Sequence, residues 1–169
     1  MLRFFLIFLV IQGVLFTTEM LQSVQQLLII PFTEGVAAVS AWLVLLFDPH
    51  VVSEGIVLRD VTNGFAVAIQ AGCNGVEATI VLVTAMLAFP SPWKHKLWGI
   101  LIGFLLVQAL NLIRIISLFY IGQWNMQVFE WMHLYLWQAL IMLDVLIVFL
   151  VWLRYLPRPA QEGETSRAP

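Results

Sequence analysis

The sequence predicts an all-α integral membrane helical bundle of about four spans, possibly five, with an interfacial helix and a small extracytoplasmic β-hairpin. Three observations predict this class. Hydrophobic residues make up 62% of the 169 residues, against about 45–50% in soluble domains. Charged residues make up only 11%, too few to cover a soluble surface, and several apolar stretches approach the length of a spanning helix. A soluble globular enzyme is therefore excluded, and the net charge of −2 also argues against a nucleic-acid partner.

The first element is predicted to be a membrane anchor, and three further spans form the core of the bundle. Each stretch is close to the ~20 residues that a spanning helix needs. In chain order the four spans are Leu2–Phe16, Gly75–Phe89, Leu97–Tyr120 and His133–Leu153.

Two stretches after the anchor are less apolar or shorter. Leu21–Ile30 contains three glutamines, and Val36–Phe47 has only about twelve residues before Asp48. Both are typical of interfacial or re-entrant helices. If Val36–Phe47 instead spans the membrane, the amino terminus moves to the outer side.

A short hairpin is predicted over Val51–Gln70, in the segment between these helices and the second span. Val57–Val61 and Phe65–Ile69 alternate with the period of a strand, and Thr62–Gly64 between them is a strong turn signal. The sequence thus predicts a single transmembrane domain over residues 1–156. It comprises the anchor and interfacial helices (1–47), the outer hairpin (48–72) and the core spans (73–156), followed by a disordered cytoplasmic tail over residues 157–169.

The distribution of Lys and Arg predicts the orientation, because cytoplasmic loops are enriched in both. With four spans, six of the eight basic residues lie on one side, which is therefore the cytoplasm. These six are Arg3, Lys94, Lys96, Arg154, Arg158 and Arg167. Both termini are then inside, and the loops over 48–72 and 122–132 face outward.

Three residues on separate helices are predicted to lie at the same depth. Cys73 lies 17 residues before Pro90, and Arg114 lies 18 residues after Lys96. His133 lies 21 residues before Arg154. At a helical rise of about 1.5 Å per residue these separations are roughly 25–31 Å, so all three side chains reach the outer rim.

Each of the three residues also has a structural interpretation. Cys73 is either an inert small apolar residue or a nucleophile at a loop-to-helix junction, where the helix dipole lowers the pKa of a thiol. Arg114 is either an interfacial anchor or a buried functional cation, and Asn111 shares its helix face. His133 is either part of an aromatic belt or a base. Glu77 and Asp144 have structural or supporting roles, or mark a proton path.

The sequence resembles the exosortase/archaeosortase family, and within it the exosortase H subgroup. The resemblance covers about residues 51–153. It is carried by Ala71-Gly72-Cys73-Asn74-Gly75-Val76, by Asn111-x-x-Arg114 near the outer end of the next span, and by His133 at the start of the last span.

The resemblance implies a membrane-embedded cysteine transpeptidase in the bacterial inner membrane, with its active site facing the periplasm. Cys73, Arg114 and His133 form the implied catalytic set, supported by Asn111, Asn74, Gly75 and Glu77, with no metal and no cofactor. The implied substrates are exported proteins that end in a short motif, a transmembrane helix and a basic cluster. For exosortase H the signal is related to PEP-CTERM and rich in Ile-Pro-Thr-Leu and Trp-Gly. The other partners are membrane lipid and an unidentified acceptor nucleophile.

The chemistry of these residue types is consistent with that activity. A Cys73 thiolate can form a thioester, His133 can transfer protons, and Arg114 can stabilise an oxyanion. Two alternatives remain at this level. The same residues could serve a hydrolytic membrane cysteine protease, or the chain could be a non-enzymatic scaffold or transporter-like bundle with an inert Cys73.

Overall fold

The computed structural model describes residues 2–156, which form a helical membrane bundle with one small antiparallel sheet, as the sequence predicts. The predicted tail over 157–169 lies outside the described residues. The elements in chain order are α1 (Leu2–Glu19), α2 (Gln22–Val24), the π-helical turn η1 (Gln25–Ile29), α3 (Ile30–Val44), β1 (Val51–Glu54), β2 (Val57–Asp60), β3 (Ala66–Ala68), α4 (Val76–Ala88), α5 (Trp93–Trp124), α6 (Met126–Trp131), the π-helical turn η2 (Met132–Leu136) and α7 (Trp137–Arg154).

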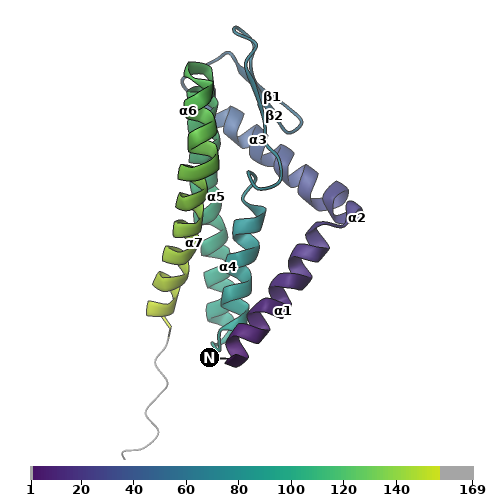
Figure 1. Ribbon diagram of the computed structural model, residues 1–169, viewed down its shortest axis with the longest axis vertical. Coiled ribbons are helices and arrows are strands. Elements are labelled where there is room, and N and C mark those ends of the chain that lie inside the picture. The colour runs from purple at the N-terminus through teal and green to yellow at the C-terminus, as the bar shows by residue number, and fades with distance from the viewer. Residues whose placement is uncertain (1, 157–169) are drawn as a thin grey trace, which may run out of the picture.

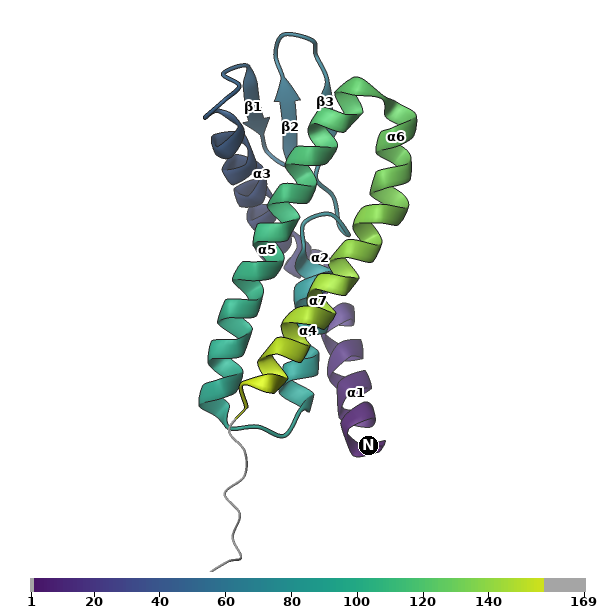
Figure 2. The same cartoon turned by 90° about the vertical axis from the view of Figure 1, so that its left-hand side faces the viewer.

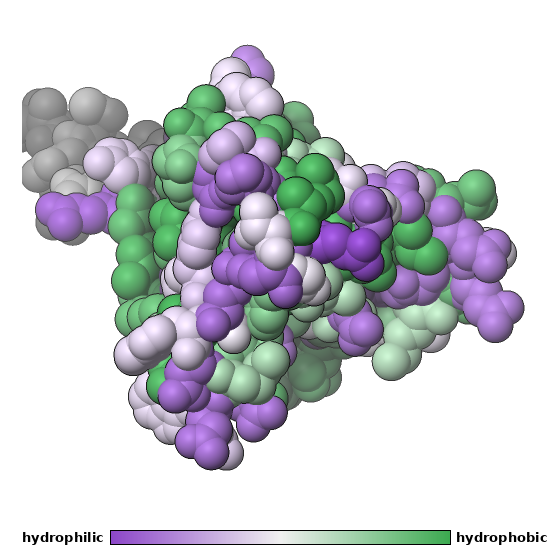
Figure 3. Space-filling model, turned by 90° about the horizontal axis from the view of Figure 1, so that it is seen from above, coloured by the Kyte–Doolittle hydropathy of each residue, from purple (hydrophilic) through white to green (hydrophobic). Residues whose placement is uncertain are grey.

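The two ends of the bundle differ in what they carry. The start of α1, the connection between α4 and α5 and the end of α7 lie at one end, which we call the lower end (Figure 1). The sheet and the corner between α5 and α6 lie at the opposite, upper end (Figure 2). Seen from above, hydrophilic residues form a band that crosses the upper end and reaches its margin, with hydrophobic residues on either side (Figure 3).

Within residues 2–156, four helices are long and apolar enough to cross a membrane: Leu2–Glu19, Gln22–Val44, Trp93–Trp124 and Met126–Arg154. Their outward faces carry large exposed apolar side chains, such as Leu9, Val39, Leu105 and Leu146. Lipid is the solvent in which such faces are stable. The protein is therefore a multi-pass membrane protein.

The second of these helices corrects the sequence prediction. Two short helices were expected over Leu21–Ile30 and Val36–Phe47, but one continuous helical run covers Gln22–Val44. The wider π-helical turn η1 ends two residues before Pro31, which has no backbone N–H to donate and would otherwise break the helix. Conversely, the predicted span Gly75–Phe89 contains only the 13-residue helix α4.

The sheet contains the predicted hairpin and one strand more. β2 and β3 pair antiparallel, with Leu58 opposite Val67, and the Asp60 carboxylate closes the turn by accepting hydrogen bonds from the Thr62 N–H and hydroxyl. These bonds lower the pKa of Asp60. The additional strand β1 pairs with β2 across a tight turn at Gly55, where φ is +59°. Four residues were too short a pattern to predict this strand.

The apolar core has two parts, and a polar layer lies between them. The upper core joins α3, the sheet and the outer half of α5, and includes Ala37, Leu58 and Phe119. The lower core joins α4, α5 and α7, and includes Leu82 and Val107. Along α5, the polar residues Gln108, Asn111 and Arg114 separate the two cores.

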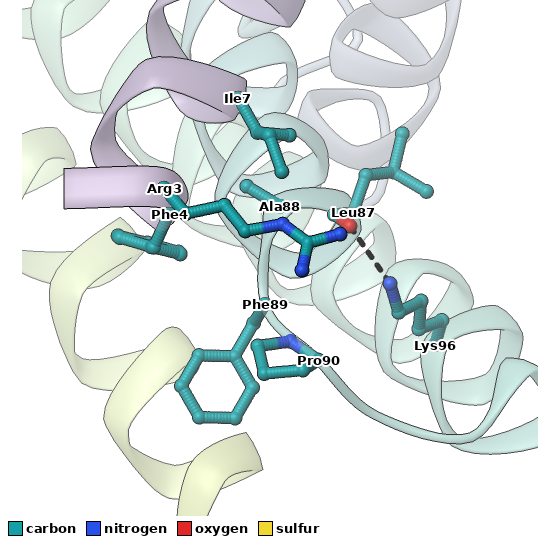
Figure 4. A pocket seen from close by; sticks show the side chains of 8 residues that line it. All are labelled: Arg3, Phe4, Ile7, Leu87, Ala88, Phe89, Pro90 and Lys96. Atoms are coloured by element: carbon teal, nitrogen blue, oxygen red, sulfur yellow. Dashed lines mark hydrogen bonds between the residues drawn. The ribbon is translucent and has the colours of Figure 1, made fainter. Parts of the chain in front are cut away.

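A cavity of about 420 Å³ lies at the lower end, where α1 packs against α4. Arg3 and Lys96 both line it, and the Lys96 ammonium donates a 2.7 Å hydrogen bond to the Leu87 carbonyl (Figure 4). Two of the predicted cytoplasmic cations are therefore neighbours at this end, far along the bundle from Cys73.

Candidate active site

The loop that carries Cys73 leads from β3 into α4. The Cys73 N–H donates a 2.9 Å hydrogen bond to the Gln70 carbonyl, which turns the chain directly after the strand. Gly72 has φ +83°, a left-handed conformation that favours glycine, and its N–H donates to the Glu77 carboxylate. Glu77 therefore holds the loop in place from the first turn of α4.

Asn74 and Gly75 fix the other side of the loop. Asn74 is only 1% exposed, donates a 3.0 Å hydrogen bond to the Thr33 hydroxyl and accepts a 3.0 Å hydrogen bond from the Val76 N–H. Gly75 has φ +79°, and a Cβ atom there would lie 2.8 Å from the Gln108 amide nitrogen. A side chain at position 75 would therefore strain the backbone and collide with α5.

Arg114 reaches the loop from α5. Its guanidinium donates a 3.1 Å hydrogen bond from Nη1 to the Gly72 carbonyl, and Nη2 lies 3.5 Å from the Cys73 Sγ. Arg114 is 3% exposed, and Asn111, one turn before it, is completely buried. Among the described residues the Arg114 Nε and the Asn111 side-chain amide have no hydrogen-bond partner. The Arg114 Nε and the Asn111 amide can therefore form further hydrogen bonds close to the loop that carries Cys73.

His133 approaches Cys73 from η2, at the start of the last long helix. Its Nδ1 and Nε2 lie 3.9 and 3.8 Å from the Cys73 Sγ. The imidazole stacks on the Phe129 ring, with centroids 5.7 Å apart and planes within 2° of each other. π-Helical turns occur often at functional sites, where the extra residue redirects a side chain. The structure therefore brings a guanidinium and an imidazole each within 4 Å of the Cys73 sulfur.

These three side chains line one cavity of about 180 Å³. The other walls come from β3 and the residues after it, from Ile115 and Leu118 of α5 and from Phe129 of α6. Within residues 2–156, no group of three or more His, Cys, Asp or Glu side chains is placed to hold a metal ion. The cavity is thus a mostly apolar cleft in which the polar groups converge on the sulfur.

Burial raises the pKa of the Cys73 thiol, and the charge of Glu77 raises it further, whereas Arg114 opposes both effects. The sequence-based expectation of a lowered pKa at a helix amino terminus is therefore wrong for this thiol. The reason is that desolvation disfavours the thiolate more than the nearby cation favours it. At neutral pH the thiol keeps its proton, and a neighbouring base has to remove it during any nucleophilic reaction.

A family comparison now bears on this geometry. The family model described as transmembrane exosortase (Exosortase_EpsH) matches residues 1–156. The chain belongs to the transmembrane exosortase family. The comparisons with curated proteins and with solved structures found no match. The exosortase resemblance of the sequence is thus confirmed over the chain as far as the end of α7.

The remaining sequence-derived candidates occupy different places in this exosortase. Glu77, Asn74 and Gly75 shape the Cys73 loop, and Asn111 lies under Gly75, with its Cγ 3.3 Å from the position of a Cβ atom there. Asp144 lines a separate groove beside Trp98 and Ile102, and has no place in the cavity around Cys73.

Two residues that contact members of the candidate site were not predicted from the sequence. Thr33, which accepts a hydrogen bond from Asn74, lies 41 positions away and left no local signal. Phe129, in contrast, precedes His133 by four residues, a helical spacing that places both rings on one face.

The electrostatic environment of Cys73 predicts opposite effects of two substitutions on its reaction with maleimide. In the wild type the rate should still rise with pH beyond about 8.5, where an ordinary cysteine is half ionised. Glu77→Gln keeps an acceptor for the Gly72 N–H but removes a negative charge, so the pKa of Cys73 falls and the rate curve moves to lower pH. Arg114→Gln removes a positive charge and moves the curve to higher pH. Stopped-flow alkylation over a pH series measures both, and shifts in the same direction would contradict this electrostatic description.

Proposed function

We propose that this exosortase is a membrane-embedded cysteine transpeptidase that cleaves the carboxy-terminal sorting signals of exported proteins. The proposed signals are of the PEP-CTERM-like type, rich in Ile-Pro-Thr-Leu and Trp-Gly, and precede a transmembrane helix and a basic cluster. One observation carries the proposal: Arg114 Nη2 and both His133 ring nitrogens lie 3.5–3.9 Å from the Cys73 Sγ, in a cavity beside a strand edge.

The first half of the reaction forms an acyl-enzyme. His133 takes the thiol proton from Cys73, and the sulfur attacks the scissile carbonyl carbon. The resulting oxyanion forms beside the Arg114 guanidinium, whose charge stabilises it. When the C–N bond breaks, the imidazolium returns the proton to the leaving amine, and the acyl group remains on Cys73 as a thioester.

The second half of the reaction regenerates the thiol. An acceptor nucleophile gives its proton to His133 and attacks the thioester carbonyl, and the imidazolium then protonates the departing sulfur. An amine acceptor makes the overall reaction a transpeptidation, whereas water makes it a hydrolysis. Arg114 cannot act as the base in either half, because a guanidinium stays protonated in proteins.

Packing supports a specific part for Arg114 in this scheme. Its Nη1 donates to the Gly72 carbonyl, so the plane of the guanidinium is fixed by the same loop that carries the thiol. The second nitrogen, Nη2, then faces the sulfur without further adjustment. Donors that are oriented before the reaction stabilise developing charge without a reorganisation cost.

The orientation that fits this function places the upper end in the periplasm and the lower end, with Arg3 and Lys96, in the cytoplasm of an inner membrane. The transmembrane helix of the substrate then lies beside the bundle, and its motif lies level with Cys73. A membrane-impermeant maleimide should label Cys73, the one cysteine of the chain, in intact spheroplasts. If Cys73 is labelled only after the membrane is opened, it faces the cytoplasm, and that result would contradict the proposal.

The decisive experiment traps the thioester. The wild-type protein and a tagged substrate with an Ile-Pro-Thr-Leu signal are co-expressed, and membranes are treated with hydroxylamine, a strong nucleophile that resolves thioesters. We expect a hydroxamate at the new carboxyl end of the substrate, identified by mass spectrometry. A new end that carries an amine-linked group without hydroxylamine identifies a transpeptidase, and a carboxylate identifies a hydrolytic protease. An uncut substrate in every arm would favour the non-enzymatic scaffold and overturn the proposal.

A further inference from the structure

β3 is an edge strand that runs directly toward the candidate site. The strand order is β1-β2-β3, and within residues 2–156 only β2 pairs with β3. An edge strand presents backbone N–H and C=O groups on which another extended chain can pair. Its last residue, Ala68, lies five positions before Cys73.

The pairing with β2 shows which backbone groups of β3 remain available. The Asp60 N–H donates to the Phe65 carbonyl and the Ile69 N–H donates to the Ile56 carbonyl, each at 2.9 Å. Backbone groups along a strand point alternately to its two sides, so those of Phe65, Val67 and Ile69 face β2. The N–H and C=O groups of Ala66 and Ala68 therefore point to the outer edge.

The same outer edge continues into the cavity. Ala68 and Gln70 line it together with Cys73 and His133, and the turn after Gln70 brings the thiol to the end of the strand. Ala66 and Ala68 are exposed and carry only a methyl group, so little side-chain bulk obstructs a chain laid along this edge. The opposite edge, formed by β1, packs against α3 and does not line the cavity.

We infer that the outer edge of β3 binds the sorting motif of the substrate as a fourth, parallel strand. This inference rests on the proposed function and adds how the motif is held. Main-chain hydrogen bonds to Ala66 and Ala68 would position the scissile carbonyl at Cys73, since in strand addition such bonds supply affinity while the alternate side chains supply specificity. At about 3.3 Å per residue, the four-residue step from Ala66 to Gln70 accommodates about four residues before the scissile bond.

The direction of the added strand follows from the position of the membrane layer. β3 runs from the turn at the upper end down toward the loop that leads into α4 (Figure 2). The substrate passes from its motif into a transmembrane helix, which has to continue toward the lower end, beside α5 and α7. Both chains therefore run downward, and the pairing is parallel.

Disulfide cross-linking tests contact and direction without requiring activity. In a Cys73→Ala background, Ala66→Cys and Ala68→Cys are each combined with single cysteines along the substrate motif. We expect cross-links at alternate motif positions, and the preferred position should move toward the scissile bond when the enzyme cysteine moves from 66 to 68. Ser53→Cys on the β1 edge is the matched control and should form no cross-link. Movement in the opposite direction, or cross-links without alternation, would overturn the parallel strand.

A proline scan tests the same hydrogen bonds in the active protein. Ala68→Pro removes an N–H that points to the outer edge of β3 and leaves the bonds to β2 intact. We expect substrate processing to fall about tenfold, with the rate of Cys73 alkylation unchanged. Ser53→Pro removes an outward N–H on the β1 edge and should process substrate like the wild type. Wild-type processing by Ala68→Pro would overturn this inference alone, whereas a wild type that leaves the substrate uncut would overturn the proposed function with it.

Discussion

Replacing Cys73 with alanine should abolish substrate cleavage while the protein still accumulates in the membrane. The sulfur is the only thiol in the chain, so no second cysteine can take over the thioester. The side chain is small and half-buried at a loop, and it packs against the upper apolar core without being one of its fully buried residues, so its loss should open little space. Cleavage is measured by immunoblot of a tagged substrate, and folding by the thermal unfolding temperature in detergent.

Cys73→Ser is the matched variant, because it preserves the shape of the side chain and changes only the nucleophilic atom. A hydroxyl is a far weaker nucleophile than a thiol unless a base is exactly aligned, and His133 is positioned 3.8–3.9 Å from the sulfur. We expect no hydroxamate from Cys73→Ser in the hydroxylamine experiment. Cleavage by Cys73→Ala at the wild-type rate would remove Cys73 from the mechanism and contradict the proposed function.

Arg114→Lys should nearly abolish cleavage although it keeps the positive charge. Arg114 uses two nitrogens of one planar group at once, Nη1 on the Gly72 carbonyl and Nη2 beside the Cys73 sulfur. Lysine has a single nitrogen on a flexible stem and cannot make both contacts. The loss of one electrostatic contact to an oxyanion costs about 10²–10³ in rate. We therefore expect a fall of that size in the rate of acyl-enzyme formation, measured by single-turnover hydroxamate release.

Arg3→Lys is the control for this charge-preserving substitution. Arg3 is exposed and lines the cavity at the lower end with Lys96, where either cation satisfies the orientation rule (Figure 4). Processing by Arg3→Lys should match that of the wild type. If purified Arg114→Lys also cleaves at the wild-type rate, Arg114 is only an anchor or a counter-charge, and its proposed role at the oxyanion is wrong.

Several features of the protein follow from the sequence alone. The membrane class follows from 62% hydrophobic and 11% charged residues, because a soluble fold of this size needs more polar surface. The common depth of Arg114 and His133 could be counted, because the helical rise per residue is nearly constant. The hairpin of β2 and β3 followed from alternating residues around a local turn. All of these depend on local geometry or on composition.

Tertiary structure decided which of these residues face one another. Depth says nothing about rotation around a helix axis, and only the packing of α4, α5 and α7 turns Cys73, Arg114 and His133 toward one point. It also decided that the Cys73 thiol is buried strongly enough for its pKa to rise, against the expectation from its place before a helix.

The dependence on contacts between distant residues also explains which elements were wrongly predicted from the sequence. The glutamines of Leu21–Ile30 and the short length of Val36–Phe47 predicted two separate short helices, but the π-helical turn η1 keeps Gln22–Val44 continuous. That continuity places Thr33 under Asn74 and so fixes the loop of Cys73 from 41 residues away. The sequence by itself thus determined that the helices lie in lipid, which family the chain belongs to, and the depth of the candidate site along the helices. Rotation, burial and long-range contacts were decided only by packing, because each depends on residues that are distant in the chain.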